Sequence, residues 1–269
     1  MLSPPEQAQK ERFEAFYNKS QLPVMRFIEQ RVCGCDYGGN SWTTRVQAEQ
    51  MVAQLGLKPG VRLLDLGAGS GWPGLYLAKM SACDAVLIDL PLAGLRVASE
   101  RAKADASPGA CWVSVADAAE LPFQDNSFDA ISHSDLLCCL QRKRAVLDAC
   151  YRAIRSGGRM IFTVITLAPQ LSSLDYGRAV ENGPEFIESE AEYPALLERA
   201  NWKILEQQDL TKEYAASCQR QLNADKEQKD ALTKLIGTVE YADRQANWAA
   251  KLIAINDGLL RRELFIVKR

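Results

Sequence analysis

The chain has few of the features that mark nucleic-acid binding, membrane passage or secretion. Its 269 residues carry one histidine and a net charge of −2, so it lacks the basic face on which phosphate backbones bind. No apolar run approaches the roughly 18–20 residues of a membrane span. The segment before Tyr17 has no apolar stretch of the kind a signal peptide needs. We therefore expect a cytoplasmic protein that binds neither nucleic acid nor membrane.

The eight cysteines lack a paired spacing. In a large, slightly acidic chain this pattern indicates reduced thiols rather than a disulfide framework. Cys33-x-Cys35 comes nearest to a metal motif, but no second pair follows at zinc-finger spacing. We predict no metal site, and expect buried, inert thiols.

The most informative segment is VRLLDLGAGSGWPG, residues 61–74. An apolar strand runs into a glycine-rich turn and then into a helical pattern, which is the start of a nucleotide-binding βα unit. Glycines allow the tight turn and let a ligand lie against bare backbone. Asp65 lies near the end of the strand, where a carboxylate repels a pyrophosphate and suits a ligand that carries an ammonium group.

This segment resembles motif I of the class I methyltransferases that use S-adenosylmethionine (SAM). The matching residues run from Asp65 through Gly67, Ala68 and Gly69 to Gly71. The resemblance implies that SAM binds here and leaves as S-adenosylhomocysteine. A rival register, Gly69–Gly74, fits the dinucleotide pattern G-x-G-x-x-G and would indicate an oxidoreductase that binds NAD(P) or FAD.

Two later strands also end in acidic residues. Asp89 ends the second strand, where a carboxylate can accept hydrogen bonds from both ribose hydroxyls, and Leu90 would lie against the adenine. SVADAAELPFQDNSFDAIS resembles the same family's segment after strand three. That resemblance implies that Asp117 accepts from the adenine amino group and that the Ala118 N–H donates to a ring nitrogen.

His133 follows the fourth expected strand, at the position that faces the sulfonium in this family. An imidazole there can act as a general base or form part of the pocket wall. The segment GGNSWTTRVQ, residues 38–47, resembles a loop that closes over the methionine end of SAM. It offers Trp42 for packing and Thr44 and Gln47 for hydrogen bonds, or else is an ordinary helix cap beside a core tryptophan. Tyr17, Trp42, His133 and Tyr176 are candidate contacts of the methyl acceptor.

Strands that alternate with helices predict an α/β fold, a Rossmann-like doubly wound sheet of seven strands with the last pair antiparallel. We expect one domain over residues 1–269. It comprises an N-terminal helical cap (1–58), a SAM-binding core (59–168) and a C-terminal half (169–269). Within that half, a helical insert (211–257) would cap the acceptor site.

The sequence therefore predicts a SAM-dependent methyltransferase that acts on an O, N or C nucleophile of a small molecule. It is most similar in type to enzymes of ubiquinone and menaquinone biosynthesis. A SAM-binding protein without transfer activity is an alternative. Arsenite methyltransferases place a cysteine after strand four, where this chain has Ser134, so that activity is disfavoured. The oligomeric state is left open.

Overall fold

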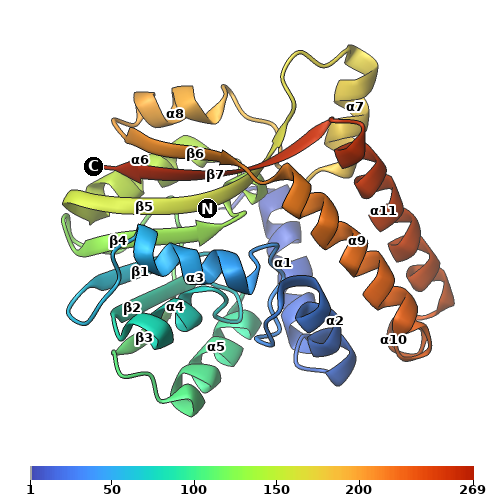
Figure 1. Cartoon of the computed structure of the whole chain (residues 1–269), viewed down its shortest axis with the longest axis horizontal. Coiled ribbons are helices and arrows are strands. Elements are labelled where there is room, and N and C mark those ends of the chain that lie inside the picture. The colour runs from blue at the N-terminus through green and yellow to red at the C-terminus, as the bar shows by residue number, and fades with distance from the viewer. Residues whose placement is uncertain (1) are drawn as a thin grey trace.

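The computed structural model describes residues 2–269. A seven-stranded sheet in the order β3-β2-β1-β4-β5-β7-β6 forms its centre. β1 to β5 are parallel, whereas β7 runs antiparallel to both β5 and β6. This confirms the predicted α/β class and the antiparallel last pair (Figure 1). The strands are β1 (Arg62–Leu66), β2 (Asp84–Asp89), β3 (Cys111–Val115), β4 (Phe128–Ser134), β5 (Ile154–Leu167), β6 (Lys203–Asp209) and β7 (Leu260–Lys268).

Helices cover both faces of the sheet and one of its ends. Eleven α-helices and one 3₁₀ turn lie within residues 2–269. They are α1 (Pro4–Lys19), α2 (Pro23–Cys33), α3 (Arg45–Gln54), α4 (Gly74–Ser81), α5 (Leu92–Asp105), η1 (Leu137–Cys139), α6 (Lys143–Ala153), α7 (Ser173–Asn182), α8 (Tyr193–Arg199), α9 (Thr211–Glu227), α10 (Lys229–Ile236) and α11 (Thr238–Asn256).

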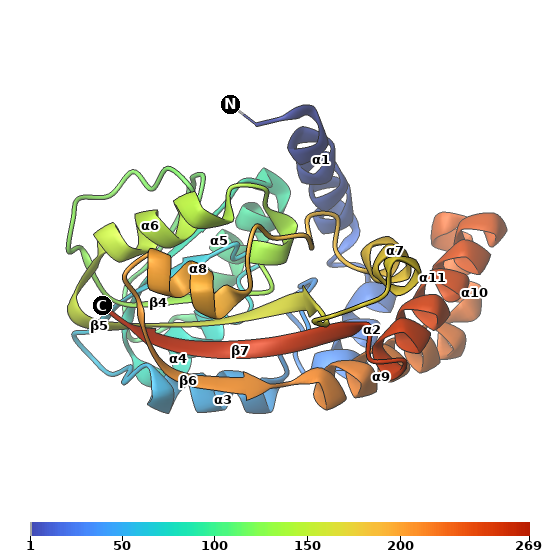
Figure 2. The same cartoon turned by 90° about the horizontal axis from the view of Figure 1, so that it is seen from above.

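The sheet faces are apolar because alternate strand residues point to opposite sides. Leu64 and Phe162 pack with α6 and α8 on one face. Leu63 and Ile161 pack with α3 and α4 on the other. Figure 2 shows these two helical layers with the sheet between them. The carboxyl ends of β1–β5 are thus held in a rigid, fully packed frame.

The remaining helices gather beyond those carboxyl ends. α1, α2, α7 and α9–α11 lie together at that end of the sheet, on the right in Figure 1. The predicted insert is helical but divides into three helices, because Gln228 and Gly237 interrupt it. α7 was not predicted. Its Ser172 N-cap, which accepts from the Asp175 N–H, is a signal that the sequence did carry.

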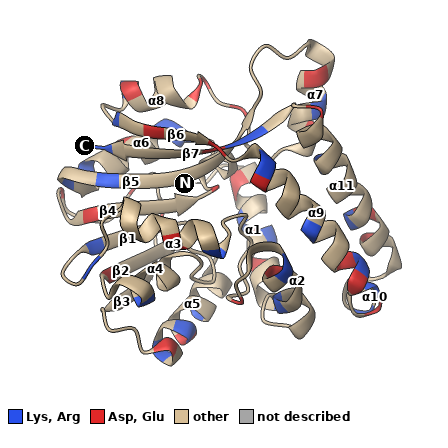
Figure 3. Cartoon of the chain, viewed as in Figure 1, with Lys and Arg blue, Asp and Glu red and all other residues tan. Residues whose placement is uncertain are grey.

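Charged side chains of both signs are interspersed along α5 and α9 in Figure 3. Within residues 2–269, no helix is both long enough and apolar enough to cross a bilayer.

Candidate active site

A cavity of about 630 Å³ opens at the carboxyl ends of the strands, between the sheet and the helices beyond it. One end, here called the cofactor end, lies over the β1, β2 and β3 termini. The other, here called the acceptor end, is walled by helices from both ends of the chain. The cofactor end includes Gly67, Asp89, Leu90, Asp117, Ala119 and Arg142, and the acceptor end includes Trp42, Ile165, Val180, Tyr214, Trp248 and Lys251.

At the cofactor end, two backbone N–H groups hold the carboxylate of Asp89 in place. Its Oδ2 accepts from the Gly69 N–H at 2.8 Å, and its Oδ1 accepts from the Leu90 N–H at 2.8 Å. These bonds aim the carboxylate along the cavity floor and leave a lone pair on each oxygen. Burial raises the pKa of Asp89 to about 6, although the two N–H donors oppose the shift. Such a carboxylate gains from further donors, such as a pair of ribose hydroxyls.

Asp117 also faces the cavity. Its Oδ1 accepts from the Ala119 N–H at 2.8 Å, and its Oδ2 accepts from the Arg142 guanidinium. Ala119 lines the cavity, whereas Ala118 is buried at 9% exposure. Asp117 is thus at the cavity surface, whereas Ala118, the expected N–H donor to the adenine ring, does not line the cavity. Leu90 lines the cavity as expected.

Asp65 lies beneath the glycine turn rather than in the cavity. It is 1% exposed, and its Oδ1 accepts from the Ser132 hydroxyl at 2.6 Å. Burial raises its pKa to about 7. The expectation that its carboxylate lies beside the ligand needs correction, because strand alternation turns it toward α4. There Gly74 leaves room for it: a Cβ on Gly74 would collide with the Asp65 carboxylate. In this structure Asp65 braces the turn.

Tyr17 occupies the space above Gly69. A Cβ built on Gly69 (φ +51°) would overlap the Tyr17 hydroxyl. The backbone of Gly69 is thus covered by α1, and Ala68 is buried as well. Among the glycines of the predicted motif, Gly67 (φ +64°) lines the cavity. Tyr17 itself lines the cavity, and burial raises the pKa of its hydroxyl.

His133 does not lie where a base acting in the cavity would be. β4 extends to Ser134, so His133 falls inside the strand and its side chain points into the core on the α6–α8 face. The imidazole is 0% exposed and stacks on Phe162 with ring centroids 4.7 Å apart. Neither ring nitrogen has a hydrogen-bond partner among residues 2–269. Burial lowers its pKa to about 3. The expected general base and acceptor contact is therefore a neutral core side chain, because strand four is longer than predicted.

Three aromatic side chains form one wall of the acceptor end. Trp42 meets Tyr214 and Trp248 edge to face, with ring centroids 5.2 and 5.4 Å apart. Tyr214 comes from α9 and Trp248 from α11. All three line the cavity. Their faces provide an apolar surface that also attracts a cation.

Lys251 brings a positive charge to the same end. Its Nζ donates to the Asn182 carbonyl, and burial lowers its pKa. Among residues 2–269 it forms no ion pair with a carboxylate. A partly buried ammonium without a counter-ion favours an anionic ligand group.

Asp135 follows β4 and lines the cavity. Its backbone has φ +52°, and its carboxylate accepts from Arg262 Nε at 3.0 Å and from Arg262 Nη2 at 2.9 Å. Arg262 is 1% exposed and also donates to the Thr43 and Thr163 hydroxyls. One buried guanidinium thus holds β7, β5, the end of β4 and the residue next to Trp42.

Three other expected contacts lie outside the cavity lining. Thr44 is the N-cap of α3 and forms a capping box with Gln47. Gln47 also accepts from Arg262. Tyr176 is 42% exposed on α7 and donates to Glu188. Of the expected loop residues, Trp42 lines the cavity.

Sequence reasoning missed Lys251, Asp135 and Arg262. Lys251 is an ordinary lysine of an amphipathic helix, and no motif marks it. No motif marks Asp135 either. An arginine inside the apolar strand RELFIVK was the available signal, because a buried charge needs partners.

The cavity fits SAM. Gly67, Asp89 and Asp117 of the lining would hold it, with the free lone pairs of Asp89 available to ribose hydroxyls. When bound, SAM supplies an electrophilic methyl group.

The comparisons with known proteins agree with this geometry. The family model described as "Methyltransferase domain" matches residues 64–162. Residues 64–162, from β1 to β5, therefore match a methyltransferase domain of the SAM-dependent class. This decides between the two glycine registers in favour of SAM. In the structure, Gly71 and Gly74 pack on Leu75 and Asp65 rather than line the cavity.

Individual relatives of the methyltransferase differ in their acceptors. Phosphoethanolamine N-methyltransferase 3 of Arabidopsis thaliana is 28% identical over 82% of this chain and 45% of its own length. The ubiquinone/menaquinone biosynthesis C-methyltransferase of Dinoroseobacter shibae is 32% identical over 46% of this chain and 50% of its own. This chain spans about half the length of these curated relatives.

A solved structure shares the whole fold. Phosphoethanolamine N-methyltransferase 2 of Haemonchus contortus, in complex with phosphomonomethylethanolamine and S-adenosylhomocysteine, superposes with a TM-score of 0.76 at 20% identity. The match covers 96% of this chain and 60% of that one. The fold of this chain is thus one that holds the SAM product in a solved relative.

Proposed function

We propose that this protein transfers the methyl group of SAM to a nitrogen of a small amine that also carries an anionic group. The observation that carries the proposal is Lys251, a partly buried ammonium without a carboxylate partner that faces the acceptor end. The names of the relatives support the class, since two of those described act on phosphorylated ethanolamines.

The protein's own residues would position and shield the acceptor. The Trp42, Tyr214 and Trp248 wall suits an amine whose charge grows with each methyl group, because ring faces attract alkylated ammonium. Lys251 would pair with the anionic group and set the distance of the nitrogen from the methyl. Tyr17 and the α9–α11 helices would close the cavity against water. In this reading α9–α11 form the cap predicted for residues 211–257.

The test is a turnover assay with the full chain and SAM. We expect S-adenosylhomocysteine to form with phosphoethanolamine-type amines and to form much more slowly with ethanolamine, which lacks the anion. Lys251→Met should raise the acceptor KM at least about tenfold, as loss of a charged hydrogen-bond partner does. SAM affinity should not change.

Two other outcomes would count against the proposal. Turnover of a quinol-type ring but not of amines would indicate C-methylation, which the apolar residues Phe13, Phe16 and Leu140 of the lining favour. SAM binding without turnover of any member of the panel would indicate a binding protein.

A further inference from the structure

A cluster of metal-ligating side chains lies outside the cavity, at the end of α2. Cys33 is the last residue of α2, and Gly34 caps the helix in the left-handed region with φ +77°. That turn brings Cys35 back beside Cys33, so the two Sγ atoms are 3.3 Å apart. Both thiols are 5% exposed.

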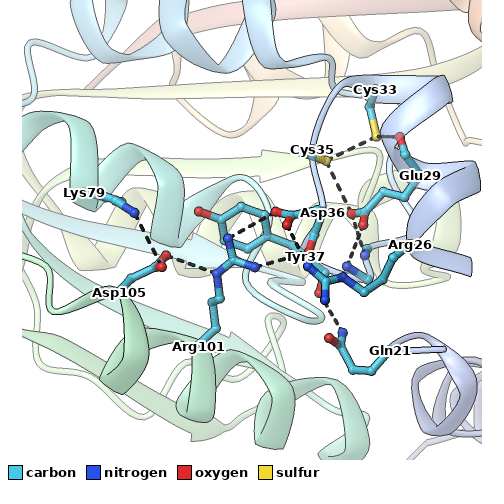
Figure 4. Close-up of polar contacts among 12 residues, drawn as sticks. Gln21, Arg26, Glu29, Cys33, Cys35, Asp36, Tyr37, Lys79, Arg101 and Asp105 are labelled. Atoms are coloured by element: carbon cyan, nitrogen blue, oxygen red, sulfur yellow. Dashed lines mark hydrogen bonds and ion pairs between the residues drawn. The ribbon is translucent and has the colours of Figure 1, made fainter. Parts of the chain in front are cut away.

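Glu29 completes the cluster from one turn earlier on the helix. Its Oε1 lies 3.3 Å from the Cys35 Sγ. The three ligand atoms all lie within 4.8 Å of one another, and Glu29 is 6% exposed. Figure 4 shows the two sulfur atoms facing each other with the Glu29 carboxylate beside them.

The spacing suits a tetrahedral ion. Metal–sulfur bonds of about 2.3 Å and metal–oxygen bonds of about 2.1 Å place neighbouring ligands about 3.6–3.8 Å apart. The two separations of 3.3 Å would therefore widen by only a few tenths of an ångström. Gly34 lies between Cys33 and Cys35, and a glycine backbone can change its dihedral angles enough to allow this adjustment.

The charge of the cluster also suits a cation. The Glu29 carboxylate and the two thiols, each of which can lose a proton, lie together at one buried point. The neighbouring arginines are engaged elsewhere, because Arg26 and Arg101 both donate to Asp36 (Figure 4). Within residues 2–269, Glu29 forms no ion pair. Its carboxylate is held by the Gly38 and Gly39 N–H groups at 2.6 and 2.7 Å.

We propose that Glu29, Cys33 and Cys35 form a binding site for a thiophilic divalent cation of the Zn²⁺ and Cd²⁺ class. Two thiolates and one carboxylate select such ions over Mg²⁺ or Ca²⁺, which prefer oxygen. Binding releases the thiol protons, and a water molecule would complete the four-coordinate shell.

The site has a structural consequence near motif I. Gly39 lies against Trp72 and Ser70, and Trp42 follows it into the cavity wall. A cation that fixes residues 33–39 would stabilise the folded state through linkage. This proposal does not depend on the identity of the methyl acceptor.

The test uses the reduced, metal-stripped full chain, titrated with Cd²⁺ alone and then with Zn²⁺ in competition. We expect one tightly bound equivalent, a cadmium–thiolate absorption band and a higher Tm. Cys33→Ser and Cys35→Ser should each weaken Cd²⁺ binding at least about 100-fold, because even partners outside the ligand shell matter 10–100-fold. Glu29→Gln should weaken it less, since both thiolates remain.

Matched variants separate this site from the other thiols. Cys111→Ser and Cys139→Ser should bind Cd²⁺ as the wild type does. Loss of the equivalent in Cys139→Ser, or its retention in Cys33→Ser and Cys35→Ser, would overturn the proposal. If these serine variants do not fold, the wild-type protein is alkylated with and without Cd²⁺, and the cysteines that Cd²⁺ protects are identified. Protection must map to Cys33 and Cys35, and protection elsewhere or none refutes the site.

Discussion

The cofactor end of the cavity stands on consecutive strand ends, whereas the acceptor end is assembled from helices at opposite ends of the chain. At the cofactor end, Asp89 ends β2 and Asp117 follows β3 of one parallel sheet, so the backbone alone brings them together. At the acceptor end, Trp42 meets Tyr214 and Trp248 only because α9 and α11 pack there. Local motifs thus place one half of the site, and long-range packing places the other.

Removing the buried Arg262 guanidinium, which holds β5 and β7 beside the end of β4, should have the largest effect. Arg262→Met leaves the Asp135 carboxylate and two threonine hydroxyls without their donor. Breaking a buried ion pair in this way costs about 3–5 kcal/mol of unfolding free energy. Chemical denaturation measures it. The double variant with Asp135→Asn, which removes the charge and tolerates the left-handed backbone, should recover part of the loss. A loss of unfolding free energy below about 1 kcal/mol would be typical of an exposed ion pair and would contradict a structural role of the buried Arg262–Asp135 pair.

SAM binding at the cofactor end can be weakened without a change at the acceptor end. Asp89→Ala should reduce SAM affinity roughly ten- to a hundredfold, since a hydrogen-bonded charged partner is worth about 1.5–3 kcal/mol. Calorimetry measures the affinity. Asp84→Ala, at the opposite end of β2, is the matched control. Equal affinities for both variants and wild type would remove Asp89 from the cofactor site.

The same carboxylate predicts a pH dependence of SAM binding. Burial raises the pKa of Asp89 to about 6, and ribose hydroxyls donate to its ionised form. Affinity should therefore be full above that pKa and fall as the pH decreases through it, about tenfold per unit. Titrations at several pH values should give this slope in wild type and a flatter profile in Asp89→Asn. A wild-type affinity that rises on acidification would have the wrong sign.

At the acceptor end, an aromatic substitution should change acceptor binding alone. Trp248→Ala should raise the acceptor KM by about tenfold, because an aromatic contact and a cation–π interaction together contribute about that much binding free energy. SAM affinity should stay the same. Trp112→Ala, on the sheet-edge strand β3, is the control and should leave both constants unchanged. A loss of SAM affinity in Trp248→Ala would mean that the two ends are not separable.

The smallest effect is expected at His133. Because the imidazole is buried and its pKa lowered to about 3, it stays neutral and out of reach of the acceptor. His133→Leu should change turnover less than about tenfold, whereas loss of a general base costs about 10²–10⁴-fold. Single-turnover rates with saturating SAM distinguish the two. A large drop without loss of stability would restore His133 as a base.

The sequence alone determined the sheet and the cofactor chemistry. An apolar strand, a glycine turn and an acidic residue after each strand are local patterns, and parallel strands necessarily bring their carboxyl ends to one edge. The sequence did not determine which residues near the strand ends face the cavity, because a strand that is longer by one or two residues keeps its last side chains in the core. His133 was assigned to the cavity for that reason, whereas Asp65 was misplaced because strand alternation turns it toward α4, and both lie in the core.

Only the tertiary structure decided the acceptor end. No spacing in the sequence relates Trp42 to Trp248, because that contact depends on where α11 packs. None relates Asp135 to Arg262, because that contact depends on the pairing of β7 with β5. It also placed Glu29 beside Cys33 and Cys35, where the sequence showed a C-x-C pair without further ligands. Contacts within one strand-turn-helix unit follow from local geometry, whereas contacts between distant segments arise from burial of apolar surface across the whole chain.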